Sequence, residues 1–277
     1  MFSCKNEEVT AIKPNEIHLA STFLQQKDSI LFQQWSRKNS IRVVIRNFTP
    51  DSLINLLKVE KFNSGIDLVI CDNLYDIMLL NKAKVLQANK TEQFSTYDSR
   101  SYNYFALGIN PYIFSSTSDS LPIPKTYDEL QENKFRCALS REEEIPMLSA
   151  LLSRLDRQKT YNWIKTYNEN KDELSGTFTL KYYSELEKNE KCVFPGQRIS
   201  GTMYNLITAG IIHQTANYKT TLSLISFIVE PSNNSKFCSQ TGVINLSNPD
   251  NIRLYRENQK KLLQYYSMIE RILDKIK

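Results

Sequence analysis

Polar side chains that could bind a ligand follow two apolar segments near the start of the sequence. Ser21 and Thr22 come directly after one segment, and Asp72 comes after another. Ser21 and Thr22 precede a helical pattern that runs through Trp35, so their hydroxyl and backbone N–H groups could donate to a carboxylate or phosphate. Arg198 could supply the counter-charge of such an anion. The alternative is that Ser21 and Thr22 only cap the helix and that Arg198 is a solvated surface residue.

The segments before these residues alternate between strand and helix patterns. Residues 16–20, 41–45 and 65–71 are short, apolar and rich in β-branched side chains, which indicates strands. Strands that alternate with helices form parallel sheets, and ligands bind beyond the carboxyl ends of such strands. This arrangement places Ser21 and Asp72 at one edge of the sheet, at the expected mouth of a binding site.

Length and composition limit the classes of protein to consider. The sequence has 277 residues, which is long for one compact core and sufficient for two lobes. Its hydrophobic fraction of 41% is typical of a globular protein, and no apolar run is long enough to span a bilayer. The net charge of +5 is spread along the chain, with basic residues alternating with acidic ones. We therefore expect no nucleic-acid partner.

Residues for catalysis or for a zinc site are not grouped in the sequence. The two histidines, His18 and His213, are far apart, and no GxSxG or HExxH motif occurs. The five cysteines include no CxxC pair, which argues against a structural zinc site. We therefore expect a protein that binds a ligand and is not an enzyme.

The segment 201–231 carries the most informative pattern in the chain. A Gly-Thr turn leads into the apolar stretch 204–212, and a helical pattern ends at Pro231. This unit resembles the return crossing of class II extracytoplasmic solute-binding proteins of ABC transporters, and most strongly their iron(III)-binding branch. Residues 104–112 resemble the crossing strand of the family, and residues 124–130 resemble its PKTYDDL turn and helix.

The resemblance covers roughly residues 15 to 245 and implies an α/β fold of two lobes, with two interlobe crossings and a C-terminal helix. We expect the crossings near residues 104–112 and 200–212. The implied divisions are an N-terminal tether, a discontinuous first lobe, a second lobe and a C-terminal helix packed on the lobes, at residues 1–13, 14–106 with 205–246, 107–204 and 247–277. The resemblance also implies a monomer outside the cytoplasm, with a small solute or metal complex and an ABC permease as partners.

Tyr182 and Tyr183 stand where the iron-binding branch carries a pair of metal-binding phenolates. Adjacent tyrosines can serve one site only in a bend, because neighbouring residues of a regular strand face opposite sides. A chance pair among the 15 tyrosines of the chain is the alternative. The Arg-His element of the opposing lobe is replaced by Phe23-Leu24-Gln25. We therefore expect iron(III) to bind weakly or not at all, and the pocket to favour a polar or anionic solute or a metal complex.

Cys4 lies in a segment, Phe2-Ser3-Cys4, that resembles the lipidation junction of bacterial lipoproteins. This expectation assumes that a signal peptide has been removed, because its apolar region is not in this sequence. It predicts a lipid anchor at Cys4 as the contact with the membrane, at the cell surface or in the periplasm. The alternative is an incidental cysteine in a cytoplasmic protein. A second reading of function also stays open, in which a surface lipoprotein uses a degenerate binding fold as a sensor or protein-interaction module.

Overall fold

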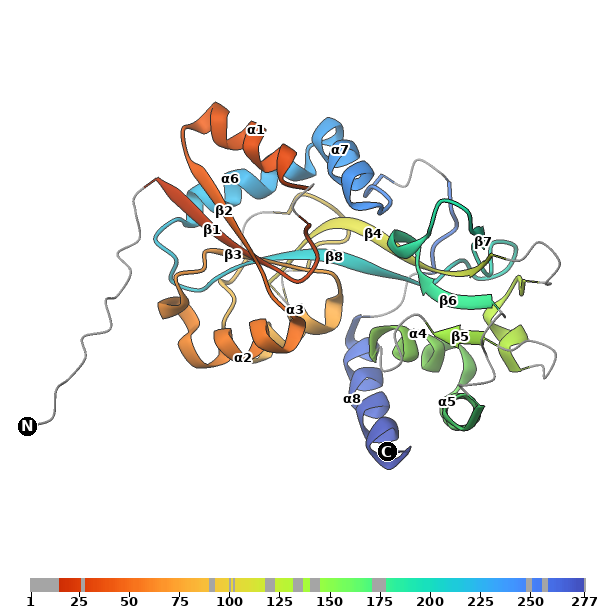
Figure 1. Ribbon diagram of the computed structural model, residues 1–277. Coiled ribbons are helices and arrows are strands. Elements are labelled where there is room, and N and C mark those ends of the chain that lie inside the picture. The colour runs from red at the N-terminus through yellow and green to blue at the C-terminus, as the bar shows by residue number, and fades with distance from the viewer. Residues whose placement is uncertain are drawn as a thin grey trace, which may run out of the picture.

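The computed structural model describes most of the chain, at residues 15–25, 28–89, 93–99, 101, 103–117, 123–131, 137–139, 145–170, 178–247, 251–255 and 259–276. Within these stretches the molecule is an α/β structure with two lobes, which Figure 1 shows at the left and at the right. Two strands, β4 (Phe105–Ser116) and β8 (Tyr204–Ile211), run from one lobe into the other. No helix within these stretches is long and apolar enough to cross a membrane.

The first lobe contains three parallel strands in the order β2-β1-β3. They are β1 (Glu16–Ser21), β2 (Arg42–Asn47) and β3 (Leu68–Cys71). They confirm the three strands predicted from short apolar segments. Helices lie on both faces of these strands (Figure 1): α1 (Ser29–Asn39), α6 (Tyr218–Val229) and α7 (Pro231–Thr241) on one face, and α2 (Pro50–Glu60), the short η2 (Lys61–Ser64) and α3 (Leu74–Lys82) on the other.

The helix predicted to start at Ser21 begins at Ser29 instead, so that prediction is wrong. The Ser21 hydroxyl accepts the N–H groups of Phe23 and Leu24, at 3.0 and 2.9 Å. It also donates to the carbonyl oxygen of Ile70, at 3.2 Å. Serine forms such local bonds in turns as readily as in helix caps, and here it closes a turn at the end of β1.

The two crossing strands are antiparallel neighbours, with Asn110 of β4 opposite Asn205 of β8. β8 also pairs with β3 of the first lobe, while the C-terminal part of β4 pairs with strands of the second lobe. The hydrogen-bonded strands thus form a continuous path, β2-β1-β3-β8-β4-β6-β5, that passes through both crossings. The crossings predicted near residues 104–112 and 200–212 are confirmed.

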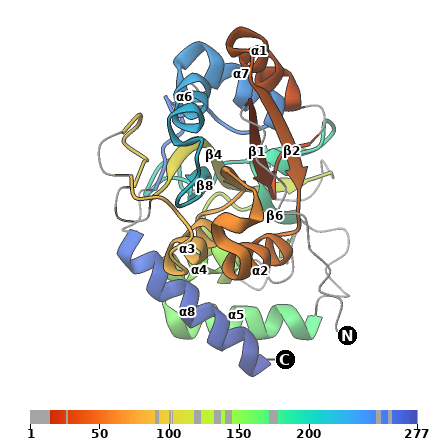
Figure 2. The same ribbon diagram turned by 90° about the vertical axis from the view of Figure 1, so that its left-hand side faces the viewer.

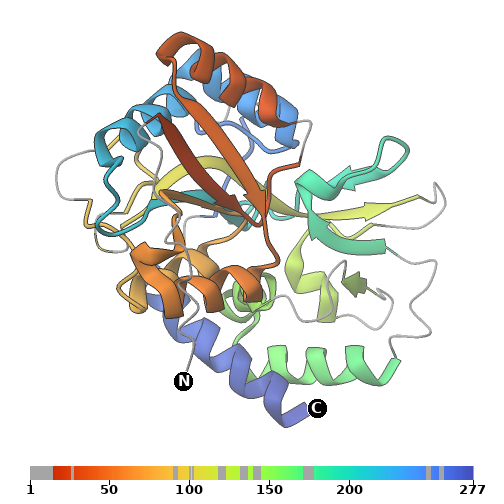
Figure 3. The same ribbon diagram turned by 60° about the vertical axis from the view of Figure 1, so that its left-hand side comes forward.

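The second lobe is built around the far end of β4, which Figure 3 shows entering it from the first lobe. Its strands are β5 (Cys137–Leu139), β6 (Phe178–Tyr182) and β7 (Lys191–Val193). Its helical elements are η3 (Tyr127–Gln131), α4 (Ile145–Leu155), α5 (Arg157–Asn170) and η5 (Tyr183–Glu185). The C-terminal helix α8 (Gln259–Ile276) packs against α4. The exact lobe boundaries predicted from the sequence stay a proposal.

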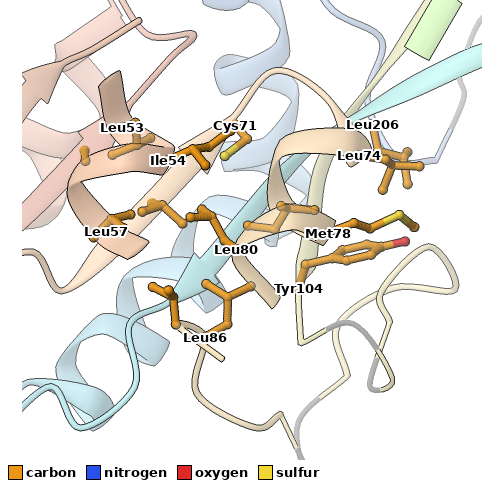
Figure 4. Packing of buried hydrophobic residues seen from close by; sticks show 14 of the residues in the cluster. Leu53, Ile54, Leu57, Cys71, Leu74, Met78, Leu80, Leu86, Tyr104 and Leu206 are labelled. Carbon is orange, nitrogen blue, oxygen red and sulfur yellow. The ribbon is translucent and has the colours of Figure 1, made fainter. Parts of the chain in front are cut away.

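A buried apolar cluster fixes α2 and α3 on the sheet of the first lobe (Figure 4). Leu53 and Leu57 of α2 and Leu80 of α3 are fully buried in it, with Tyr104 directly before β4. Each such aliphatic side chain stabilises the fold by about 1.5–3 kcal/mol relative to exposure. The cluster therefore holds the N-terminal end of α3 firmly at the carboxyl ends of the strands.

Candidate functional site

Thr22 and Asp72, which were predicted at one edge of the sheet, are in contact there. The Thr22 hydroxyl donates to Oδ1 of Asp72 at 3.2 Å and accepts the Asp72 N–H at 3.3 Å. Ser21 is fully buried beside them, and its hydroxyl is bonded within the turn. Neither Ser21 nor Thr22 caps α1, so the helix-dipole argument for an anion does not apply to them.

Two buried carboxylates meet at the N-terminal end of α3. Asn73 is the N-cap of this helix and accepts the Asp76 N–H at 2.9 Å. Its amide donates to Asp72 Oδ1 at 2.8 Å and to Asp76 Oδ2 at 3.0 Å. Asp72 and Asp76 are only 7% and 4% exposed. Burial, followed by the charges of Asp76 and Asp72, holds the pKa of the neighbouring Cys71 thiol well above its usual value. The turn is therefore a region of concentrated negative charge.

Tyr182 ends β6 opposite Tyr112 of the crossing strand, and the two ring centroids are 5.0 Å apart. Its ring belongs to the second-lobe core, and the residue is 2% exposed. Its hydroxyl accepts a hydrogen bond from the Asn205 amide at 3.4 Å. The Asn205 Oδ1 in turn accepts the N–H of Leu74 at 3.0 Å, in the first turn of α3. Asn205 therefore joins the second-lobe tyrosine to the acidic end of α3 in the first lobe.

Tyr183 begins the 3-10 turn η5 directly after β6 ends, so the bend that adjacent tyrosines require is present. The two rings nevertheless have different surroundings. The half-buried Tyr183 ring lies 5.3 Å from that of Phe194, centroid to centroid, and packs against the first-lobe cluster. Ser184 exchanges hydrogen bonds with Asn110 of β4 at 2.9 and 3.1 Å, which holds the turn on the crossing strand.

Arg198 does not interact with the other predicted site residues within the described stretches. It is exposed, in the turn between Pro195 and Gly201. It makes no hydrogen bond or ion pair with any of the other predicted site residues that the structure describes. Leu24, where the resemblance implied a lost ligand, is 3% exposed in the first-lobe core. Cys4 lies outside the described residues.

The histidines do not take part in the acidic turn. His18 Nε2 lies 3.5 Å from Glu16 Oε2 on β1, and His213 Nδ1 lies 3.1 Å from Gln87 Oε1. Within the described stretches, no group of three or more His, Cys, Asp or Glu side chains is placed to hold a metal ion. Any metal bound here would therefore need phenolate oxygens or oxygens of its own ligands to complete its coordination.

A buried ion pair supports the segment that carries both tyrosines. Lys181 Nζ lies 2.9 and 2.8 Å from the two carboxylate oxygens of Glu190. The Glu187 N–H and the Ser115 hydroxyl also donate to Glu190, at 2.9 and 3.3 Å. Burial alone would raise the pKa of Glu190, but these hydrogen bonds and the Lys181 charge outweigh it, so the pKa lies below its usual value.

The residues that sequence reasoning missed are Asn73, Asp76 and Asn205. Asn205 lies within the Gly-Thr segment that carries the resemblance, and this position was its one signal in the sequence. Asn73 and Asp76 directly follow Asp72 in the sequence, where the spacing Asn-x-x-Asp at a helix start suits a helix cap. Their link to the second lobe depends on contacts between distant segments, which spacing alone does not reveal.

This chain is similar to known proteins in its structure. No protein-family model matches the sequence, and no curated protein is similar to it. Several solved structures match over nearly the full length. The Trichodesmium protein IdiA (FutA), in complex with iron and citrate ligands, matches with a TM-score of 0.77 at 15% identity, covering 94% of this chain and 99% of that one.

Two further solved structures also match over nearly the full length of this chain. The ferric binding protein from Campylobacter jejuni matches with a TM-score of 0.76 at 14% identity, over 94% of this chain and 99% of its own. Iron-bound HitA from Pseudomonas aeruginosa also has a TM-score of 0.76, at 11% identity and the same coverage of 94% and 99%. The chain has the class II periplasmic-binding-protein fold. The class II fold of this chain confirms the architecture that the sequence resemblance implied, and its neighbours are binding proteins.

Proposed function

We propose that this protein is the extracytoplasmic solute-binding component of an ABC-type uptake system, and that it binds its solute between the two lobes. The observation that carries the proposal is the meeting of Tyr182, Asn205 and the acidic end of α3. These groups come from the second lobe, a crossing strand and the first lobe. In a two-lobed fold, groups that converge from both lobes change their spacing when the lobes move. This makes them suited to hold a solute in the closed state.

Charge and donor type favour a metal complex over a simple anion as the solute. The ionisable groups that accept hydrogen bonds from the Asn73 amide at the start of α3 are the carboxylates of Asp72 and Asp76. The hydroxyls expected from the sequence to bind an anion are engaged, by the turn in the case of Ser21 and by Asp72 in the case of Thr22. Carboxylate and phenol oxygens are donors suited to hard cations.

The opposing lobe supplies apolar Leu24 where the iron-binding branch supplies ligands. A bare iron(III) ion would thus lack donors from the protein on one side. A complex that brings its own oxygen ligands would fill those positions, and the Trichodesmium neighbour holds iron together with citrate. We therefore propose a metal complex as the solute, with Tyr182 and Tyr183 as the candidate phenolate donors and Asp72 as a first-lobe contact.

Adding ferric citrate to the purified protein is expected to raise its thermal unfolding midpoint without any turnover, because a ligand that binds only the folded state stabilises it. The Tyr182→Phe variant should bind at least about tenfold more weakly, since even outer partners of a metal are worth roughly 10–100-fold in affinity. Isothermal titration calorimetry measures the affinity, and the visible tyrosinate-to-iron band reports direct ligation. Tyr218→Phe, on α6, is the matched control. Equal affinity in all three proteins would remove Tyr182 from the site.

We also propose that the protein acts outside the cytoplasm and is anchored by a lipid on Cys4. The Phe2-Ser3-Cys4 junction supports this proposal. When the chain is expressed behind a signal peptide that directs cleavage before Cys4, in bacteria fed labelled palmitate, the label is expected in the protein and not in its Cys4→Ser variant. Label that persists in the variant, or no label in either protein, would contradict the anchor. Such a result would leave the solute-binding proposal intact.

A further inference from the structure

The C-terminal helix α8 contacts both lobes, as Figures 1 and 2 show from two directions. On the second-lobe side, Ile269, Ile272 and Leu273 are buried in the core that includes α4. On the first-lobe side, Tyr266 is 4% exposed and belongs to the apolar cluster around α2 and α3. Residues of one helix, three to four positions apart, thus pack into the cores of two different lobes.

A polar contact joins α8 to the start of α3. The Tyr75 hydroxyl donates to the carboxylate of Glu270. The Tyr75 ring also meets the Tyr266 ring edge-on, with centroids 5.1 Å apart and planes at 74°. Burial, and then the hydrogen bond and charge of Glu270, raise the pKa of Tyr75 above its ordinary value. The phenol is therefore a protonated donor over the whole neutral range.

Tyr75 lies next to the residue that connects α3 to the candidate site. The N–H of Leu74 is bonded to Asn205, which also bonds to the Tyr182 hydroxyl. Asp72, Asn205 and Tyr182 are 7%, 2% and 2% exposed, so a solute can reach them only when the structure opens. If the lobes separate about the crossing strands, α3 moves relative to α4, and α8 cannot follow both helices.

The two contacts of α8 differ in kind, and this difference decides which one separates. Its contact with the second lobe includes three buried aliphatic side chains, with Tyr265 and Met268 packed against the same core. These side chains become exposed to water only if the whole helix detaches. Its contact with the first lobe is smaller and includes the buried Tyr266 ring, which meets Tyr75 edge-on, and the hydrogen bond from Tyr75 to Glu270. Tyr266 is as buried as Ile272, at 4% exposed, so separation at α3 exposes one buried ring, whereas detachment from the second lobe exposes three buried side chains.

We propose that α8 is a strap fixed to the second lobe whose Tyr75–Glu270 contact holds the lobes closed and separates when they open. The strap rests on the proposed function in one respect, namely that the lobes move apart to admit a solute. It predicts that breaking the contact raises the open fraction of the protein without solute. The first turn of α3 would then couple lobe position to the hydroxyl of Tyr182 through Asn205.

The test measures the distance between the lobes in the full-length protein without any ligand. Spin labels are placed at two exposed lysines, Lys58→Cys on α2 and Lys159→Cys on α5, after Cys4 and Cys192 are changed to serine. Double electron–electron resonance then gives the distribution of inter-label distances. Tyr75→Phe and Glu270→Ala should each raise the ratio of long to short distances by about tenfold, the effect of losing one hydrogen bond to a charged group. Asp274→Ala, at an exposed position of the same helix, should leave the distribution unchanged.

The outcomes distinguish a failure of the strap proposal from a failure of the proposed function. Unchanged distances in Tyr75→Phe and Glu270→Ala, with both variants folded by circular dichroism, would overturn the strap. The solute-binding proposal would stand in that case, because it is tested by titration with ferric citrate. An increase in long distances together with no binding of ferric citrate would support the strap and count against the proposed solute. A change as large in Asp274→Ala would overturn the strap, because it would show a general effect of altering α8.

Discussion

Gly201→Ala is expected to destabilise the protein by about 4 kcal/mol, which combines about 1–3 kcal/mol of backbone strain with about 1–3 kcal/mol of overpacking. Gly201 has a φ of +98°, a conformation that side chains with a Cβ rarely adopt. An added Cβ would lie 2.8 Å from the carbonyl oxygen of Arg253 and 2.9 Å from the nitrogen of Tyr255. These are backbone atoms and cannot rotate away.

The reason for this close approach is a short docking contact between two distant segments. The N–H of Thr202 donates to the Arg253 carbonyl at 2.7 Å, and the N–H of Tyr255 donates to the Thr202 carbonyl at 2.9 Å. The buried Thr202 hydroxyl donates to the Pro195 carbonyl at 2.7 Å. The Gly-Thr pair, which the sequence shows as part of a family-like pattern, therefore also has a structural role, because it fixes the segment that leads to α8.

Urea denaturation measures the free energy of unfolding of Gly201→Ala, and the chain offers a matched control. Gly65 has a φ of +65°, and a Cβ there would meet nothing within 4 Å. Gly65→Ala should therefore cost only the strain of the left-handed conformation, about 1 kcal/mol. If Gly201→Ala lowers the free energy of unfolding by no more than Gly65→Ala does, Arg253 and Tyr255 do not approach Gly201 as closely as described.

Glu190→Gln is expected to destabilise the second lobe by about 3 kcal/mol, because it leaves the Lys181 charge buried without its counter-charge. The side chains of Lys181 and Glu190 are only 11% and 9% exposed. The exposed pair of Lys159 and Asp156, with side chains 56% and 60% exposed, is the matched control. Asp156→Asn should cost no more than about 0.5 kcal/mol, because water screens such pairs. Equal costs for the two variants would show that Lys181 can reach solvent.

The pKa of Glu190 also predicts how the stability of the folded protein changes in acid. Because the folded-state pKa of Glu190 lies below the unfolded value of about 4.3, its contribution to stability is fully present above that pH. The contribution is lost as pH falls through the folded-state pKa. The wild-type protein should therefore lose more thermal stability than Glu190→Gln between neutral pH and about pH 3, by at least about 2 °C in the unfolding midpoint.

Much of the fold could be predicted from the sequence because its strands have a strong local pattern. β3 is four buried apolar residues followed by Asp72, and such a run between polar residues reads as a strand in a covered sheet. The start of α1 was missed because Ser21 can close a turn or cap a helix with equal ease. The choice depends on the Ile70 carbonyl, 49 positions away, which local sequence cannot indicate.

The candidate site was predictable only in part, for the same reason. Thr22 and Asp72 could be brought together because both follow parallel strands, whose carboxyl ends meet at one edge. Asn205 could not be assigned to the site, since its partner Leu74 is 131 positions away, at the start of α3. The sequence made a bend at the two tyrosines only a condition for a shared site, and their separate ring environments depend on Tyr112 and Phe194.

The position of β8 in the sheet has a consequence for how the chain is made. β8 lies between β3 and β4, with Cys71 of β3 opposite Thr208 of β8, yet it is synthesised after all the strands of the second lobe. Until it arrives, a growing chain has an open sheet edge on β3, and the first-lobe part of β4 lacks a partner while its far end can already pair with β6 and β7. The first lobe cannot complete its sheet earlier, so its contacts between distant residues must form late. In a chain of this design the first lobe stays incomplete for most of its synthesis, which would keep that part able to thread through a narrow channel before it folds.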